Sequence, residues 1–262
     1  MNGEQMTAVR RIRFAVKVLA RRGRQVVRLA HAGGSMIKGG TLMSVLKATG
    51  WFQDFTDEQL REIASFGRIK RIADKKLLFV QGEPLTDYFF VVDGLVHAYH
   101  QNKEGKRWIA SLFASGDLFP HVGLADDESH YPANGGTITP CLLLVISRTN
   151  MQKLMLRYPV LERRLTEFLA KKSRELMNRY ADSVLEPALN QLLSLLKRLA
   201  STSGTPASSG WTLIRHAMTE QDMAGYLGVT PETVSRLLNR LYREKRAKSA
   251  GRGKIYIDLE RC

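Results

Sequence analysis

The chain has 262 residues, 44% of them hydrophobic, and a formal charge of +15 from 40 Lys and Arg against 25 Asp and Glu. This length favours one large or two modest domains, and the apolar fraction excludes wholesale disorder. The longest apolar run, Cys141–Ile146, is too short for a transmembrane helix. Two cysteines cannot form a disulfide framework, so we expect a cytoplasmic protein whose positive charge serves an anionic partner, either nucleic acid or a membrane surface.

The positive charge is concentrated at the two ends of the chain, with a net +8 over residues 1–42, +2 over 43–182 and +5 over 183–262. Three interpretations of the first segment are open. Val9–Ala30 has the pattern of a basic amphipathic helix that would lie on a membrane or an acidic partner, and the segment is also compatible with a disordered tail. We favour the third: Lys38-Gly39-Gly40 can be encoded by a purine-rich ribosome-binding sequence, so residues 1–42 would be a basic extension that is not translated, with the start at Met43.

Residues 43–158 combine a helical segment with a series of short strands. The apolar spacing predicts helix from Met43 to Ile69, with Thr56 as an N-cap. Turn signals every 8–12 residues then separate β-branched or aromatic runs, which is typical of a small antiparallel barrel or jelly roll. The predicted strands are Lys76–Gln81, Tyr88–Val92, Gly94–His100, Arg107–Phe113, Thr137–Thr139 and Cys141–Ser147.

Helices follow this β-rich region. A short helix over Asn150–Arg157 ends at Tyr158-Pro159, and a long one, assigned to residues 159–182, begins near Val160. The long helix has an approximate coiled-coil seam, for which the natural partner is a second copy of the chain; packing against its own β-domain is the alternative. The seam consists of Leu165, Leu169, Leu176 and Tyr180, with an interruption near Lys172. Another helix is predicted over Ala188–Ala200, and a surface loop over Ser201–Gly210.

The last segment has the pattern of two short helices joined by a tight turn. Thr219 caps the first helix, Gly228-Val229 supplies the turn, and Thr230 caps the second helix with Pro231 at its first position. This arrangement predicts a helix-turn-helix. The second helix would bury Val234, Leu237, Leu238 and Leu241. A basic hairpin, Lys245–Gly253 followed by a short strand, then has the pattern of a wing that contacts phosphates.

The exposed face of the second helix carries side chains suited to reading bases. Glu232, Ser235 and Arg236 are spaced i, i+3 and i+4, so they share one face near the helix N-terminus. Arg pairs with guanine, Glu accepts from cytosine, and Ser bonds either way. The alternative is a helical hairpin with an ordinary solvated face. The predicted DNA-binding residues are Thr219, Thr230, Glu232, Thr233, Ser235, Arg236, Asn239, Arg240, Lys248, Arg252 and Lys254.

The segment Thr219–Leu241, with Tyr-Leu-Gly-Val-Thr-Pro-Glu-Thr-Val-Ser-Arg-Leu-Leu at 226–238, resembles the helix-turn-helix of the Crp/Fnr family of bacterial transcription regulators. The resemblance extends from about Met43 to Asp258. It implies an α+β chain that is not an enzyme: a jelly-roll sensor domain of cyclic-nucleotide-binding type (43–158), a dimerisation helix (159–182) and a winged helix-turn-helix (183–262). It also implies a homodimer that binds DNA and RNA polymerase and no membrane.

The recognition helix is similar to that of the fumarate–nitrate branch of the family, which has Glu-x-x-Ser-Arg. This similarity implies an inverted repeat of TTGAT-like half-sites, with Arg236 on guanine, Glu232 near the opposing cytosine and Ser235 on a thymine. The chain departs from the family at Lys245-Arg246-Ala247, where members usually have Gly-Leu-Ile before the wing.

The sensor region departs from the family's cyclic-nucleotide cassette. The cassette aligns with Gly116–His121 and Tyr131–Ala133, but His121 replaces the ribose-binding Glu and Tyr131 the phosphate-binding Arg. Because Tyr cannot supply the charged, bidentate contact of Arg, we expect that cAMP is not the effector. The effector pocket, predicted from Phe119, His121, Tyr131 and Ala133, would instead take an unidentified small molecule.

Other cofactors have weak support in the sequence. Two cysteines cannot hold an iron–sulfur cluster; Cys141 is predicted to be an unreactive core thiol, with redox sensing as the alternative. The four histidines of the β-region are predicted to be ordinary and partly exposed, with haem binding as the alternative and no metal assigned. They are His97, His100, His121 and His130. A cupin-like jelly-roll metalloprotein is the second interpretation of the whole chain, although the clustered ligands that it needs are not found.

Overall fold

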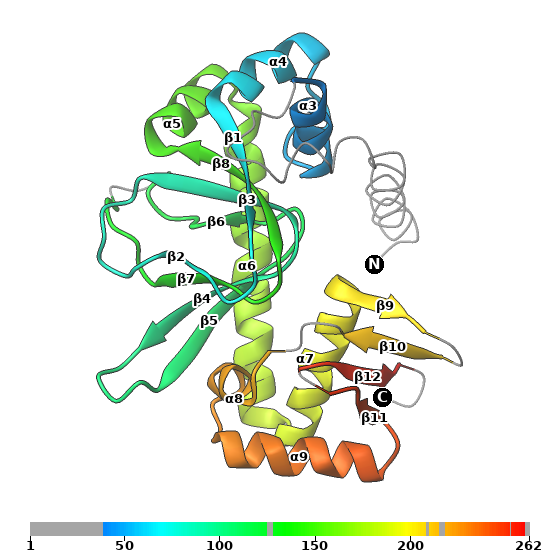
Figure 1. Cartoon of the computed structure of the whole chain (residues 1–262). Helices are drawn as coiled ribbons and strands as arrows, with labels where there is room; N and C mark the ends of the chain where they lie inside the picture. The colour runs from blue at the N-terminus through cyan, green and yellow to red at the C-terminus, as the bar shows by residue number, and fades with distance from the viewer. Residues whose placement is uncertain (1–38, 125–127, 208–209, 215–217, 252, 260–262) are drawn as a thin grey trace.

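The computed structural model describes residues 39–124, 128–207, 210–214, 218–251 and 253–259. Figure 1 shows one long helix, α6 (Val160–Leu185), with the β-rich region along its upper part and the C-terminal helices and strands at its lower end. No helix in these described ranges is long and apolar enough to span a bilayer. The architecture is therefore the predicted α+β one: an antiparallel β-domain, a long helix and a helix-turn-helix.

The chain begins, within the described residues, with two short helices, α3 (Gly39–Ala48) and α4 (Asp57–Phe66). The prediction of one helical segment from Met43 to Ile69 is wrong at both its middle and its end. Gly50 has a φ of 76°, which ends α3, and Gly67–Ile72 forms strand β1, whose polar exposed positions concealed it from the apolar pattern. Thr56 does cap α4, in a capping box with Gln59.

Met43 lies inside α3, whose first residues precede it. Leu42 and Met43 are half-buried and pack against the hydrophobic core of the β-domain. The untranslated leader was predicted over residues 1–42, of which 1–38 lie outside the described residues, so a start at Met43 stays a prediction.

Two four-stranded antiparallel sheets form the β-domain (Figure 1). One has the order β1-β8-β3-β6 and the other β2-β7-β4-β5, as a jelly-roll-type fold requires. After β1 the strands are β2 (Leu77–Phe79), β3 (Asp87–Asp93), β4 (Val96–Gln101), β5 (Arg107–Phe113), β6 (Leu118–Phe119), β7 (Asn134–Thr137) and β8 (Cys141–Ser147). The predicted strand Thr137–Thr139 is misplaced because the hydroxyl of Thr139 is used outside the ladder, where it accepts a hydrogen bond from the backbone of Leu95 at 2.8 Å. β6 is too short to leave a sequence signal.

Helix α5 (Arg148–Arg157) follows β8, and its N-terminus is capped by Ser147. Helix α6 then changes surroundings along its length of about 39 Å. In its first half, Leu165 and Phe168 are buried against the β-domain of the same chain. In its second half, Leu176 and Tyr180 are 53% and 71% exposed. The prediction that Leu165 belongs to the dimer seam is therefore wrong. Leu165 packs against the β-domain of its own chain, which was the alternative interpretation.

The C-terminal region begins with α7 (Ala188–Ser203) and contains a third sheet of order β11-β12-β10-β9. Its strands are β9 (Gly204–Pro206), β10 (Trp211–Ile214), β11 (Ala247–Ser249) and β12 (Ile255–Asp258). The prediction of a loop over Ser201–Gly210 is wrong for its first six residues, since α7 extends to Ser203 and Gly204–Pro206 forms the edge strand β9. A Cβ atom at Gly204 would lie 2.3 Å from the carbonyl oxygen of Ala200, so only glycine allows the strand to leave the helix this closely.

Candidate nucleic-acid interface

The helix-turn-helix consists of α8 (Glu220–Leu227) and α9 (Pro231–Arg243). Thr219 caps α8: its hydroxyl accepts from the backbone N–H of Asp222 at 3.0 Å and donates to the Asp222 carboxylate at 2.7 Å. Gly228, with a φ of 74°, makes the turn between the helices. Thr230 caps α9 by accepting from the backbone of Thr233, and Pro231 occupies the first turn. The predicted caps and turn are confirmed.

One face of α9 anchors the helix and the other faces solvent. Val234, Leu238 and Leu241 are buried, while Leu237, also predicted to be buried, is only partly so. Figure 1 shows α9 at the lower end of the molecule, away from the β-domain. The helix can therefore approach a groove of DNA without any of these anchoring contacts breaking.

The predicted base-reading residues lie together on the solvent face of α9. Glu232 and Arg236 are exposed and Ser235 is half-buried. The Arg236 guanidinium donates to the Thr233 hydroxyl at 3.1 Å, which holds the side chain along the helix. The pKa of Glu232 is lowered by the backbone N–H at the helix N-terminus, then by the Thr230 hydroxyl and Arg236. Glu232 is therefore an ionised carboxylate, which accepts hydrogen bonds and does not donate them.

The remaining predicted contact residues surround this face. Asn239 and Arg240 are exposed on later turns of α9, where Arg240 donates to Glu244 at 2.7 Å. Lys248 and Lys254 are exposed on the wing formed by β11 and β12. Lys248 lies 4.0 Å from the centre of the Trp211 ring, a cation–π contact that orients it. Arg252 lies outside the described residues.

The wing forms despite the departure from Gly-Leu-Ile. Lys245 adopts a φ of 55°, the left-handed conformation that glycine at this place would take without strain. Arg246 is half-buried beside Glu244, at 3.6 Å, and Ala247 is fully buried. The substituted residues therefore reproduce the turn, at a cost located at Lys245.

The predicted effector residues lie in the β-domain as packed aromatic groups. Tyr131 is 4% exposed, and its ring stacks on Phe79 with 4.0 Å between ring centres. Its hydroxyl accepts from the backbone N–H of Asp87 at 3.1 Å and donates to the Asp87 carbonyl at 3.2 Å. Phe119 is buried between Phe89 and Phe113, and Ala133 is buried as well.

His121 completes this set, with its ring 6.0 Å from that of Phe113 and 6.1 Å from that of Phe168 on α6. A cavity of about 440 Å³ lies between the two sheets at the β1 and β2 edges, and of the four predicted residues only Tyr131 lines it. The structure thus places Phe119 and Tyr131 in the core of the β-domain, while His121 is half-buried, and Tyr131 supplies no charge to hold a phosphate.

Comparison with known proteins agrees with this geometry. Residues 69–158 match the cyclic nucleotide-binding domain family, and residues 190–261 match the Crp-like helix-turn-helix domain family. The anaerobic regulatory protein of Bacillus subtilis is 24% identical over 213 residues, which cover 80% of this chain and 89% of that protein. The chain belongs to the Crp/Fnr family. It is a DNA-binding transcription regulator and not an enzyme, which replaces the metalloprotein interpretation.

Other Crp/Fnr proteins similar to this one carry different effectors in their names. A CRP-like cAMP-activated global transcriptional regulator of Mycobacterium tuberculosis is 22% identical over 184 residues, covering 70% of this chain and 81% of that protein. The c-di-GMP responsive global regulator CLP of Xanthomonas campestris has the same fold, with a TM-score of 0.62 at 19% identity over 74% of this chain and 94% of that one. The fold alone therefore does not identify an effector.

The histidines and Cys141 of this Crp/Fnr regulator lie in unlike surroundings. His97 is 7% exposed, which corrects the expectation of partly exposed histidines, and burial lowers its pKa to about 4. His100 stacks on Trp108, and His130 is exposed. Within the described ranges no cluster of three or more His, Cys, Asp or Glu is placed to hold a metal. Cys141 is buried, as predicted, and burial raises its pKa to about 11.

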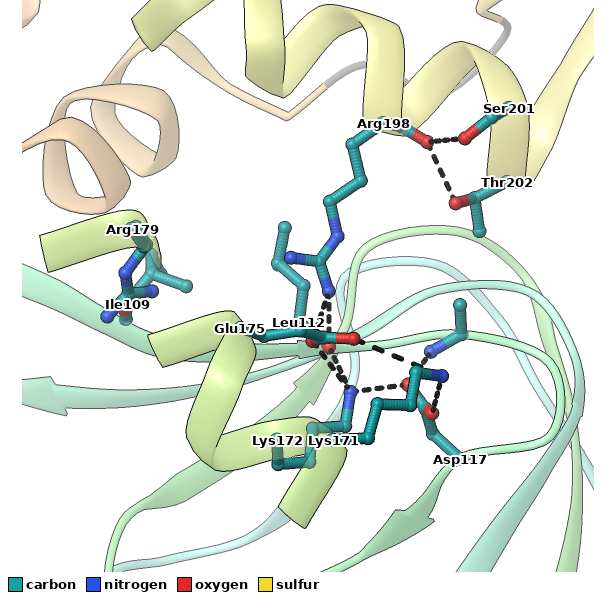
Figure 2. Close-up of polar contacts among 11 residues, drawn as sticks. Ile109, Leu112, Asp117, Lys171, Lys172, Glu175, Arg179, Arg198, Ser201 and Thr202 are labelled. Carbon is teal, nitrogen blue, oxygen red and sulfur yellow. Dashed lines mark hydrogen bonds and ion pairs between the residues drawn. The ribbon is translucent and has the colours of Figure 1, made fainter. Parts of the chain in front are cut away.

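One buried cluster of charged residues was missed in the sequence. Lys172, which interrupts the apolar seam of α6, is buried and forms an ion pair of 2.8 Å with buried Asp117, the second residue of the cassette. Glu175 and Arg198 extend the cluster to the DNA-binding region (Figure 2). The interruption of the apolar seam at Lys172 could have indicated a buried ion pair. It was not interpreted in this way because a lysine on a helix is usually solvated.

Proposed function

We propose that this Crp/Fnr regulator binds as a homodimer to an inverted repeat of TTGAT-like half-sites. The group of Glu232, Ser235 and Arg236 on the solvent face at the start of α9 carries the proposal. An ionised Glu232 accepts from cytosine N4, Arg236 donates two bonds to the opposing guanine, and Ser235 contacts a thymine. Two such helices enter successive major grooves when they are about 34–36 Å apart.

The exposed apolar strip on α6 supports the homodimer. Leu176, Met177, Tyr180 and Val184 recur at helical spacing, and each exposes more than half of its surface. A second copy of the same strip, related by a two-fold axis, would remove both from water. A Tyr180→Glu variant would sediment as a monomer at concentrations at which the wild type sediments as a dimer.

Phosphate contacts complete the interface in this proposal. Thr219 and Thr230 lie at the N-termini of the two helices, where their caps and the helix dipoles favour phosphate. Thr233, Asn239 and Arg240 flank the base-reading group. Lys248, Arg252 and Lys254 of the wing then contact the backbone beyond the major groove. RNA polymerase is the expected protein partner at the promoter.

The effector is a small molecule other than cAMP. Tyr131 occupies the place of the phosphate-binding arginine, and its hydroxyl is already bonded to the backbone of Asp87. A phosphate there would lie against a buried aromatic ring, where the family has the guanidinium of an arginine. Isothermal titration with cAMP and, separately, with c-di-GMP tests this, and cAMP binding at micromolar concentration would overturn it. The absorption spectrum of the purified protein shows whether haem is bound.

Fluorescence anisotropy on labelled duplexes tests the half-site assignment. The expected result is binding to the TTGAT inverted repeat at least about a hundredfold tighter than to a scrambled duplex of equal composition, since each mismatched pair costs about 1–3 kcal/mol. The same affinity for both duplexes, at several salt concentrations, would refute the assignment.

A further inference from the structure

The DNA-binding region and the β-domain share one hydrophobic core. Tyr99, Ile109 and Leu112, on the outer face of the β4–β5 hairpin, are buried in the same cluster as the leucines of α7 and as Met223 of α8. The strand β5 lies at the edge of its sheet, so its outer backbone groups are open to other partners. The position of the helix-turn-helix is therefore set by what binds to β5.

A β-bulge in β5 determines which carbonyl groups face this edge. In the pairing of β4 with β5, Ala98 lies opposite Ser111 and Tyr99 opposite Ile109, which leaves Ala110 as an extra residue. One extra residue reverses the alternation of the strand, so the carbonyls of Ile109 and Leu112 both face the free edge. Without the bulge, residues three apart would point to opposite sides.

Three cations from the helices bind these two carbonyls (Figure 2). Arg179 of α6 donates to the Ile109 carbonyl at 3.0 Å. Lys172 of α6 and Arg198 of α7 both donate to the Leu112 carbonyl, at 3.4 and 3.3 Å. Lys172 belongs to the dimerisation helix and Arg198 to the DNA-binding region, so two cations from different units meet at one acceptor.

Glu175 of α6 neutralises this meeting point. One of its carboxylate oxygens lies 3.3 Å from Lys172 and 3.1 Å from Arg198, and the other lies 3.9 Å from Lys171. Lys172 also pairs with Asp117 at 2.8 Å, so the contacts run without a gap from the cassette to α7. Two cations at one carbonyl repel each other, and Glu175 offsets that repulsion in a half-buried setting where charges interact strongly.

We propose that Glu175 is a positioning residue for DNA recognition: by pairing with both Lys172 and Arg198, it fixes the DNA-binding region against the edge of β5 and so fixes the separation of the two recognition helices in the dimer. The proposal rests on the homodimer proposed above. Glu175 lies on α6 and not on the DNA-reading face of α9, so it acts on DNA through the domain that it holds.

This role has a distinctive consequence. A single half-site is bound by one α9, and a substitution at Glu175 leaves the side chains of α9 unchanged. A full inverted repeat is bound tightly only when both helices are held at the correct separation, because the second contact is then intramolecular. Loss of Glu175 therefore weakens binding to the repeat and leaves binding to a single half-site unchanged.

The experiment uses Glu175→Gln, with Glu167→Gln as the matched control on the exposed surface of the same helix, where Glu167 lies 3.8 Å from Arg163. Spin labels at Ser65→Cys on α4 and Arg243→Cys on α9, both exposed, report the distance between the β-domain and α9 of one protomer by pulsed electron resonance, in a full-length Cys262→Ser background. Labelled chains are mixed with an excess of unlabelled chains, so that most dimers carry the two labels on a single protomer. We expect one narrow distance distribution for the wild type and Glu167→Gln, a broadened or shifted one for Glu175→Gln, and restoration by Glu175→Asp.

DNA binding supplies the second readout. We expect Glu175→Gln and Arg198→Gln each to lower affinity for the inverted repeat about tenfold and affinity for a single half-site less than twofold, and the double variant to be no worse than either one. An unchanged distance distribution in Glu175→Gln overturns the proposal, whatever sequence the protein binds. A wild type that does not prefer the TTGAT repeat contradicts the half-site assignment alone, because the distance measurement needs no DNA.

Discussion

Gly225 of α8 lies so close to Arg107 of β5 that a Cβ atom at Gly225 would be 2.5 Å from the Arg107 carbonyl oxygen. The obstacle is backbone, so it cannot rotate away as the end of a side chain would. Glycine in mid-helix normally costs stability relative to alanine, which makes its presence here a sign that the close approach matters. This contact sets the distance between the helix-turn-helix and the β-domain.

We expect Gly225→Ala to destabilise the protein by about 1–3 kcal/mol, as overpacking in a rigid core does, against the gain in helix propensity. Urea unfolding measures the difference. Gln221→Ala, exposed on the same helix, is the control and should stabilise slightly or change nothing. If Gly225→Ala raises the urea midpoint as well, α8 is not packed as closely on β5 as described.

The strained backbone at Lys245 gives a prediction of opposite sign. Its φ of 55° costs a side-chain-bearing residue about 1–2 kcal/mol, and glycine carries no such cost. Lys245→Gly should therefore raise the free energy of unfolding, by about 0.5–1 kcal/mol after the greater entropy of glycine in the unfolded chain is counted. At Arg243, which is helical and exposed, the same change should lower stability. A loss at both positions would mean that the turn before the wing is not left-handed.

His97 makes stability depend on pH. Its pKa is lowered to about 4, chiefly by burial, which outweighs the opposing effect of Asp222 and is assisted by Arg107; its Nδ1 has no hydrogen-bond partner among the described residues. The ordinary pKa in the unfolded chain is about 6.5. As pH falls below 6.5 the unfolded state takes up a proton that the folded state refuses, so this contribution is full above pH 6.5 and is lost progressively down to pH 4.

The loss attributable to His97 is about 3 kcal/mol over that window. Because carboxylates titrate in the same range, the measurement is the difference between wild type and His97→Gln in urea midpoints from pH 7.5 to 4.5. The two curves should converge toward low pH, since the variant has no imidazole to protonate. Parallel curves would mean that His97 is already solvated.

Cys141 should be unreactive in the folded protein. Burial raises its pKa to about 11, so very little thiolate is present at neutral pH, and the thiolate is the reactive form. In a Cys262→Ser background, reaction with a disulfide reagent should be absent on the minute scale and complete in denaturant. Rapid reaction of the native protein would revive the redox-sensing alternative for this chain.

The parts of the fold that were predicted correctly depend on local chemistry. Thr219 and Thr230 cap their helices with a hydroxyl that accepts from an N–H three residues later, so the local sequence alone is enough to predict the cap. The strand Arg107–Phe113 was predicted with its exact bounds for a similar reason, since it lies between two strong turn signals. Such features need no knowledge of the rest of the chain.

The errors arise where a distant segment decides. Nothing local distinguishes Leu165 from Leu176, yet the β-domain covers one and leaves the other exposed. Lys172 is buried where it pairs with Asp117, 55 residues earlier, and His97 is buried within the electrostatic reach of Asp222, on the distant helix α8. The same holds for the predicted effector residues. Sequence spacing aligned Tyr131 with the cassette, but the stacking of Tyr131 on Phe79 depends on the tertiary structure.

Arg236 and Lys254 should affect DNA binding in different ways, and the contrast tests the interface. Arg236→Ala removes a base contact, so it should cost about 1–3 kcal/mol on the inverted repeat and relax the preference at one base pair of each half-site. Lys254→Ala removes a phosphate contact, so it should weaken binding equally on all sequences and reduce the slope of log affinity against log salt by about one. Anisotropy titrations at four salt concentrations, on the repeat and on each single-base variant, separate the two. If Arg236→Ala weakens random DNA as much as the repeat, then Arg236 contacts the backbone, and sequence is read by other residues of α9.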